Sequence, residues 1–149
     1  MHIRSVHPFH HPPFSLQIPL QLSHISAGFP SPADGHIAQA LDLNELLIEH
    51  PSATFFVRVQ GDSMKKSGIC SGDILVVDRA QRAKEGDVII AVLHGEFTVK
   101  RWICQQGKWF LKAENDSYPL IPLHEDSGFE IWGVVTHAIH VLKKEPCML

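Results

Sequence analysis

The sequence predicts a mainly β protein: a compact antiparallel β domain with one short helix and an extended N-terminal arm. Two observations carry this prediction. First, six short apolar runs beyond residue 53 follow a period of two and are separated by turns that contain glycine. Second, only one stretch has helical periodicity, so strands and helices do not alternate as they do in Rossmann or α/β-hydrolase folds.

The first 32 residues predict the arm. They contain six of the ten prolines and no acidic residue. Proline removes amide donors and opposes helix formation, so this segment is expected to be extended. The apolar residues between Phe14 and Leu22 favour an arm that packs on the domain until it is released, with a disordered tail as the alternative. Contact of Ile18, Pro19 and Leu20 with a sliding clamp is a weaker alternative than packing of the arm.

One helix and six strands are predicted after the arm. The helix, at residues 42–49, begins with Asp42 and Glu45 at the spacing of a capping box, and Pro51 ends it. The strands alternate apolar and polar side chains and are bounded by turn residues. Their predicted ranges are 54–60, 73–78, 88–93, 97–103, 109–113 and 130–141.

The composition limits the function. A chain of 149 residues with 44% hydrophobic and 19% charged residues is long enough for one domain with a core. Its net charge of −3 and scattered basic residues predict no direct binding to DNA. Three cysteines without C-x-x-C spacing indicate a reducing compartment. With no apolar stretch near the roughly 18 residues of a membrane span, a cytoplasmic protein is expected.

The eleven histidines raise the question of a metal site. His7, His10 and His11 cluster among prolines, and His137 and His140 lie three apart in a predicted strand, where they point to opposite faces. No suitable thiol or acid spacing accompanies either group. The sequence therefore predicts no metal site and no cofactor.

Ser63 and Lys100 are the candidate catalytic residues. Ser63 follows a predicted strand and the turn residues Gly61 and Asp62, and Lys100 lies in an apolar strand. A lysine in low-dielectric surroundings loses its proton near neutral pH and can then act as the general base for a serine. Because Lys100 and Arg101 are neighbours on opposite faces of one strand, one of them must point toward the interior or a cleft. From the residues alone, a solvent-facing lysine and an ordinary turn serine stay open as alternatives.

Two other serine motifs compete for Ser63. The Gly-Asp-Ser triplet resembles the GDSL hydrolases, but those need an α/β fold and a late Asp-x-x-His pair that this chain does not have. Ser63 and Lys66 match the S-x-x-K motif of penicillin-binding enzymes, but neither S-D-N nor K-T-G follows.

Six motifs occur in order along the chain: Ala27-Gly28-Phe29-Pro30-Ser31-Pro32, Gly61-Asp62-Ser63-Met64, Gly72-Asp73, Gly86-Asp87, Glu96-Phe97-Thr98-Val99-Lys100 and Trp132-Gly133-Val134-Val135. Together they closely resemble the self-cleaving LexA/UmuD family of bacterial SOS-response proteins, over residues 14–141. The block 28–64 is most similar to the UmuD branch, whose members are accessory subunits of a mutagenic DNA polymerase. The fold that this resemblance implies is the compact β domain shared with type I signal peptidases, which are membrane-anchored.

The resemblance implies a role for each matching residue. Ser63 corresponds to the nucleophile, Lys100 to the general base, and Ala27 and Gly28 to the scissile pair. Alanine at that first position is the LexA-like version, whereas UmuD proteins often have cysteine there. The chain would therefore consist of a cleavable arm at residues 1–27 and a self-cleaving peptidase domain at residues 28–149.

The resemblance also implies partners. Family members form homodimers and cleave themselves slowly until a RecA filament on single-stranded DNA stimulates them. The processed form of this chain would serve a Y-family DNA polymerase in translesion synthesis. With about 27 residues before the cut and no helical periodicity there, the chain is not expected to be a repressor. The alternatives are a phage-type self-cleaving regulator without a DNA-binding domain and a non-catalytic β module that binds the polymerase or the sliding clamp.

Overall fold

A computed structural model describes residues 1–10, 18–21 and 37–143 of the chain. The chain divides into two compact units. One unit combines Met1–His10 with His50–Leu149, and the other is His11–Glu49. The expected cleavage pair, Ala27 and Gly28, lies outside the described residues. No helix within the described part is long and apolar enough to cross a membrane.

The smaller unit contains a hairpin and the helix. Strands β2 (Ile18–Gln21) and β3 (Ile37–Leu41) pair antiparallel, and helix α1 (Leu43–Leu47) follows. The predicted N-cap is confirmed, because the Asp42 carboxylate accepts a hydrogen bond from the Asn44 amide at 2.8 Å. The helix is shorter than predicted because the backbone at Ile48 is already extended.

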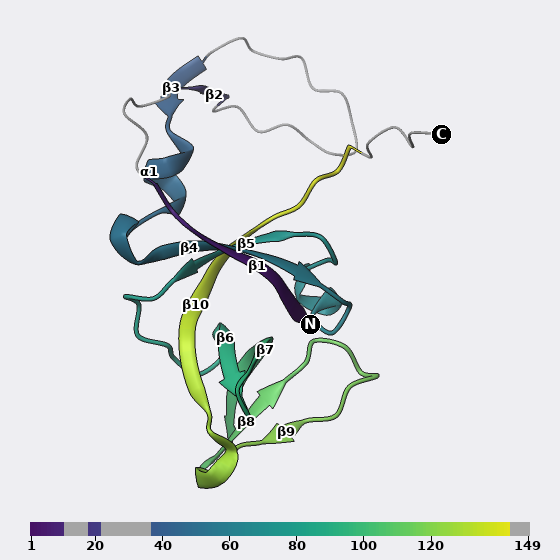
Figure 1. Cartoon of the computed structure of the whole chain (residues 1–149). Helices are drawn as coiled ribbons and strands as arrows, with labels where there is room; N and C mark the ends of the chain where they lie inside the picture. Colours follow the sequence, from purple (N-terminus) through teal and green to yellow (C-terminus); the bar gives the residue numbers. More distant parts are fainter. Residues whose placement is uncertain (11–17, 22–36, 144–149) are drawn as a thin grey trace. The chain divides into compact units, whose positions relative to one another are not determined.

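The larger unit is an eight-stranded antiparallel sheet, which confirms the predicted fold class (Figure 1). The order of the strands is β1-β4-β5-β10-β6-β7-β8-β9, and His2 of β1 also pairs with Thr98 of β7. That pairing joins the first strand back to β7, so six strands close on themselves into a small barrel. The strands are β1 (His2–Pro8), β4 (Thr54–Gln60), β5 (Ile74–Asp78), β6 (Val88–Leu93), β7 (Glu96–Gln105), β8 (Lys108–Lys112), β9 (Ile121–Pro122) and β10 (Glu130–Ile139).

Three short 3-10 helices complete the larger unit: η1 (Pro51–Ala53), η2 (Lys65–Ser67) and η3 (Glu125–Ser127). All six strands predicted after the arm are present, with ends shifted by at most two residues. Strand β1 was not predicted. It pairs antiparallel with β4 along its whole length, with a bulge between Ile3 and Ser5.

Strand β10 joins the two halves of the sheet (Figure 1). Its first residues pair with β6 and its later residues pair with β5. A register irregularity between Ile131 and Gly133 accompanies this change of partner. A Cβ atom on Gly133 would lie 2.6 Å from the side chain of Val77, so only glycine fits there.

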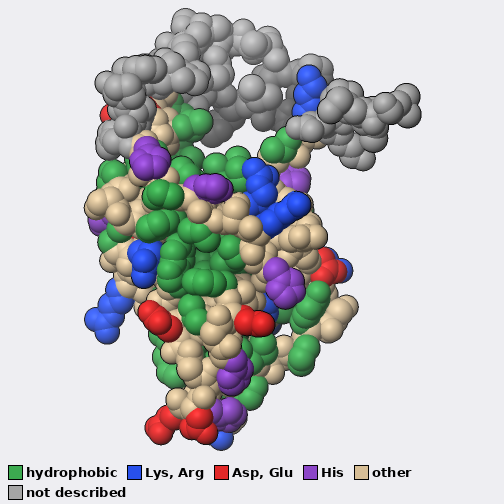
Figure 2. Space-filling model, viewed as in Figure 1, with side chains coloured by type: hydrophobic (Ala, Val, Ile, Leu, Met, Phe, Trp, Pro, Cys, Tyr) green, Lys and Arg blue, Asp and Glu red, His purple; other side chains and the backbone are tan. Residues whose placement is uncertain are grey.

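Two apolar clusters form the core. One contains Met1 together with Val57, Val59, Met64, Ile69, Leu75, Val77, Ile90 and Val99. The other is centred on Ile89, Ala91 and Leu111. Figure 2 also shows hydrophobic side chains gathered on the surface over the crossing of β10 with β4 and β5. The first cluster also fixes the turn after β4, because Met64, which lies in this turn, is buried in the cluster.

Candidate active site

Ser63 lies in the tight turn that follows β4. Gly61, with φ of +108°, provides the left-handed backbone that ends the strand. The loop after β8 then holds Asp62 on both sides: the Asn115 amide donates to its carbonyl at 3.0 Å, and the Tyr118 hydroxyl donates to its carboxylate at 2.6 Å. Next to Asp62, Ser63 has 0% of its surface exposed. The turn thus presents the serine hydroxyl toward the interior of the barrel.

Lys100 points at this serine from β7. Its Nζ lies 3.2 Å from Ser63 Oγ, 3.1 Å from Thr98 Oγ1 and 3.1 Å from the Val99 carbonyl oxygen. The residue is 5% exposed. Pairing of Lys100 with Ile89 of β6 fixes its position along the strand. The structure therefore brings together two residues that are 37 positions apart in the sequence.

The electrostatic surroundings of Lys100 favour its neutral form. None of the ion pairs between described residues includes Lys100. Its burial removes water from the ammonium group and so lowers the pKa of Lys100, while a hydrogen bond with the Met1 amino group opposes part of that shift. A neutral amine can accept a proton from a hydroxyl, and an ammonium cannot.

Arg101, the next residue on β7, has the opposite surroundings. Its Nε donates to the Glu114 carboxylate at 2.5 Å, and Nη1 donates to the Gly86 carbonyl at 2.6 Å. Of the two neighbouring cations, Lys100 is therefore the one that enters the barrel. The sequence had left this choice open.

Met1 also reaches the serine. Its α-amino group donates to Ser63 Oγ at 2.6 Å, and its carbonyl accepts from Thr98 Oγ1 at 3.3 Å. The Met1 side chain is part of the core, with 6% of the residue exposed. Burial, followed by repulsion from Lys100, lowers the pKa of this amino group to about 5.

The sequence identified Ser63 and Lys100 but missed three groups around them. Nothing in the sequence indicated Met1, Asn115 or Tyr118. Thr98 was detectable, because it lies two residues before Lys100 in a strand and so shares its face.

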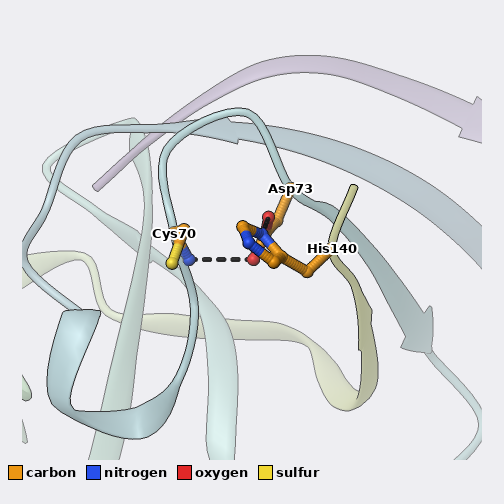
Figure 3. A group of neighbouring side chains, drawn as sticks. All are labelled: Cys70, Asp73 and His140. Atoms are coloured by element: carbon orange, nitrogen blue, oxygen red, sulfur yellow. Dashed lines mark hydrogen bonds and ion pairs between the residues drawn. The ribbon is translucent and has the colours of Figure 1, made fainter. Parts of the chain in front are cut away.

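One cluster of side chains in the larger unit has the chemistry of metal ligands. Cys70, Asp73 and His140 each offer a ligand atom within 4.8 Å of the others (Figure 3). The Asp73 carboxylate already accepts from the Cys70 amide at 2.8 Å and lies 2.6 Å from His140 Nδ1. Both carboxylate oxygens therefore have a partner within the protein, and these contacts tie the residue after β10 to the turn before β5.

A groove in the described part contains neither Ser63 nor Lys100. It is an open groove of about 760 Å³ whose wall includes the stacked rings of Trp102 and Trp109. No nucleophile or buried base lines it. The groove is therefore separate from the pair formed by Ser63 and Lys100.

Comparison with known proteins gives a consistent result. Residues 19–136 match the family model of peptidase S24-like proteins. Protein MucA of Escherichia coli is 46% identical over 123 residues, which cover 82% of this chain and 84% of MucA. Protein ImpA of Shigella flexneri is 46% identical over 122 residues, covering 82% and 83%. The LexA repressor of Psychromonas ingrahamii is 37% identical over 122 residues, covering 82% of this chain and 57% of the repressor. The chain belongs to the peptidase S24-like family and is a UmuD-like member of its LexA/UmuD group of self-cleaving SOS proteins.

Proposed function

We propose that this protein cleaves its own Ala27–Gly28 peptide bond, with Ser63 as the nucleophile and Lys100 as the general base. The observation that carries the proposal is the 3.2 Å contact between Lys100 Nζ and Ser63 Oγ in a buried site. General bases act over such hydrogen-bond distances. The lowered pKa of Lys100 favours the neutral amine that the reaction needs.

The proposed reaction has two steps. In the first, neutral Lys100 takes the proton of the Ser63 hydroxyl as Oγ attacks the carbonyl carbon of Ala27. The C–N bond to Gly28 then breaks, Lys100 returns the proton to the departing amine, and Ala27 is left as an ester on Ser63. In the second step, Lys100 deprotonates a water molecule as its oxygen attacks the ester carbon. The bond from that carbon to Ser63 Oγ then breaks, Lys100 returns the proton to Oγ, and the released Ala27 carboxylic acid ionises.

We further propose that the processed chain, residues 28–149, is a homodimeric accessory subunit of an error-prone Y-family polymerase in the cytoplasm. A RecA filament on single-stranded DNA would stimulate the cleavage. Membership of the UmuD-like group supports this role. Co-purification of the processed chain with such a polymerase tests it, and failure to bind would favour a self-cleaving regulator instead.

Self-cleavage is tested directly with the purified chain. Incubation at alkaline pH should produce two fragments, and mass spectrometry should place the cut between Ala27 and Gly28. The matched control, Ser63→Ala, should stay intact and keep its melting temperature, because it loses only the nucleophilic oxygen. Cleavage of the Ser63→Ala protein, or a cut at another bond, would overturn the proposal.

A further inference from the structure

We propose that β1 is an autoinhibitory strand that holds Met1 against Ser63 and must leave the edge of β4 before a peptide bond can reach the nucleophile. This inference rests on the proposed function, since it concerns access to the same serine. It adds a step, the release of β1, that must precede cleavage.

The pairing of β1 directs its first residue toward the active site. His2 lies opposite Gln60, the last residue of β4, and Pro8 lies opposite Phe55 near the start of that strand. Continuing the same antiparallel direction places Met1 beside Gly61, where a Cβ on the glycine would lie 3.5 Å from Met1 Cα. The N-terminal end of β1 therefore lies at the turn that carries Ser63.

Met1 fills the space that a substrate needs. The nucleophile has no exposed surface, and Lys100 is almost completely buried. Met1 contributes to this burial, because its amino group contacts Ser63 Oγ and its side chain belongs to the core cluster beside Met64. A carbonyl carbon must come within about 3–3.5 Å of the attacking oxygen. With Met1 in place, the Met1 nitrogen already occupies a position 2.6 Å from that oxygen.

The amino group of Met1 also opposes the chemistry. Ser63 Oγ accepts hydrogen bonds from both Met1 and Lys100. A lone pair engaged by the Met1 amine is not available for attack on a carbonyl. Two amines on one hydroxyl also repel each other when charged, which is one cause of the depressed pKa of Met1.

Within β1 itself, few side chains are buried against the sheet. Most of its side chains are exposed, and only Ile3 and Ser5 within the strand are partly buried. The bulge between these two residues interrupts its pairing with β4. Strands with few buried apolar contacts are among the first parts of a fold to open. These features fit a strand that can leave while the rest of the barrel stays folded.

The first test releases the strand by mutation in the full-length chain. Ile3→Glu places a carboxylate against the core, whereas the matched control Val6→Glu changes an exposed residue of the same strand. If β1 is docked most of the time, Ile3→Glu should accelerate self-cleavage by about tenfold or more, in proportion to the released fraction. Val6→Glu should cleave at the wild-type rate.

Two further measurements report on the strand without requiring cleavage. Hydrogen–deuterium exchange should increase at the β4 amides in Ile3→Glu, and a fluorophosphonate probe should label Ser63 faster than in wild type. If exchange shows that β1 has been released while neither labelling nor cleavage accelerates, the inference is wrong. If Ser63 is labelled faster in Ile3→Glu but neither this variant nor the wild type cleaves itself, the proposed function is wrong. The inference that β1 blocks access to Ser63 would still hold.

The second test locks the strand and guards against misfolding of Ile3→Glu. Ser5 and Arg58 are opposite each other in β1 and β4, so the substitutions Ser5→Cys and Arg58→Cys can form a disulfide. In a protein that also carries Cys70→Ser, Cys104→Ser and Cys147→Ser, oxidation should stop cleavage and a reducing agent should restore it. The same background without the cysteine pair is the control. Cleavage at an unchanged rate in the cross-linked protein would overturn the inference.

Discussion

The two neighbouring cations of β7 lie in opposite surroundings. Lys100 enters the barrel and contacts two hydroxyl groups and a carbonyl, whereas Arg101 lies on the other face with Glu114 as its partner. One step along a strand therefore separates a lysine that can lose its proton from an arginine that keeps its charge. In the proposed mechanism, the lack of an ion-pair partner for Lys100 among the described residues is therefore as important as the serine itself.

The choice of residue type agrees with these surroundings. A guanidinium group is always charged in proteins and cannot act as a base, so arginine suits the face that carries a carboxylate. A lysine in a buried site without an acid loses its proton more readily. An exchange of these two surroundings would leave the serine without a base.

Replacing Lys100 is expected to have the largest effect. Both Lys100→Ala and Lys100→Arg should slow self-cleavage by about 10²–10⁴-fold, the range that a positioned general base contributes. The arginine variant sharpens the comparison, because it keeps a cation but cannot accept a proton. Gel assays of fragment formation measure the loss, and circular dichroism controls for folding. A Lys100→Arg protein that cleaves at the wild-type rate would show that another group is the base.

The pH dependence of cleavage should be the next largest effect. Because the pKa of Lys100 is lowered from its ordinary value of 10.5, the neutral form should accumulate at lower pH than in a free lysine. The rate should rise about tenfold per pH unit and then level off at a pH below 10.5. The Met1 amino group, with a pKa of about 5, titrates well below this range. Rates between about pH 6 and 11 test the prediction, and a flat profile would contradict it.

Removing the partner of Arg101 should affect stability but not catalysis. Glu114→Gln breaks a half-buried pair whose side chains are 31% and 17% exposed. The expected loss is about 1 kcal/mol, or a decrease in melting temperature of about 2–4 °C. The pH midpoint of cleavage should not move, since Glu114 makes no ion pair with Lys100. A shifted midpoint would mean that Glu114 interacts electrostatically with Lys100 across β7.

The smallest effect is expected at Lys66, which also pairs with an acid but lies in solvent. The side chains of Lys66 and Asp116 are 51% and 87% exposed. Exposed pairs are screened by water and salt, so Lys66→Ala should leave the melting temperature and the cleavage rate unchanged. Calorimetry and the gel assay check this, and a clear loss of cleavage would assign Lys66 a role in the site.

Much of this molecule was predictable because its local patterns are strong. Strand β4 has an alternating, β-branched sequence that ends at Gly61, and β6 was predicted with its observed ends. The N-cap of α1 was also visible, since Asp42 has a side chain that can accept from the helix amides. Chemistry and family resemblance predict Ser63 and Lys100 as the catalytic pair, and the structure places the two side chains in contact.

The remainder depends on long-range contacts that local sequence does not encode. Strand β1 has weak alternation and precedes a proline-rich segment, and it forms because the edge of β4 offers it backbone partners. The inward direction of Lys100 depends on its register against β6. The contact of Met1 with Ser63 follows from both and joins residues 62 positions apart.

The place of β1 in the main sheet changes what cleavage accomplishes. A cut between residues 27 and 28 breaks the covalent link, but the backbone hydrogen bonds between β1 and β4 do not depend on it. Because β1 leaves β4 before the cut in our proposal, the fragment is undocked at the moment of cleavage, but it can bind the same edge again like a complementing peptide. Its departure is governed by a dissociation constant and therefore by dilution and competing strands. Maturation would then depend on two rates, the rate of hydrolysis and the rate at which the fragment dissociates. Gel filtration of freshly cut protein distinguishes them, because it separates the complex from the free fragment.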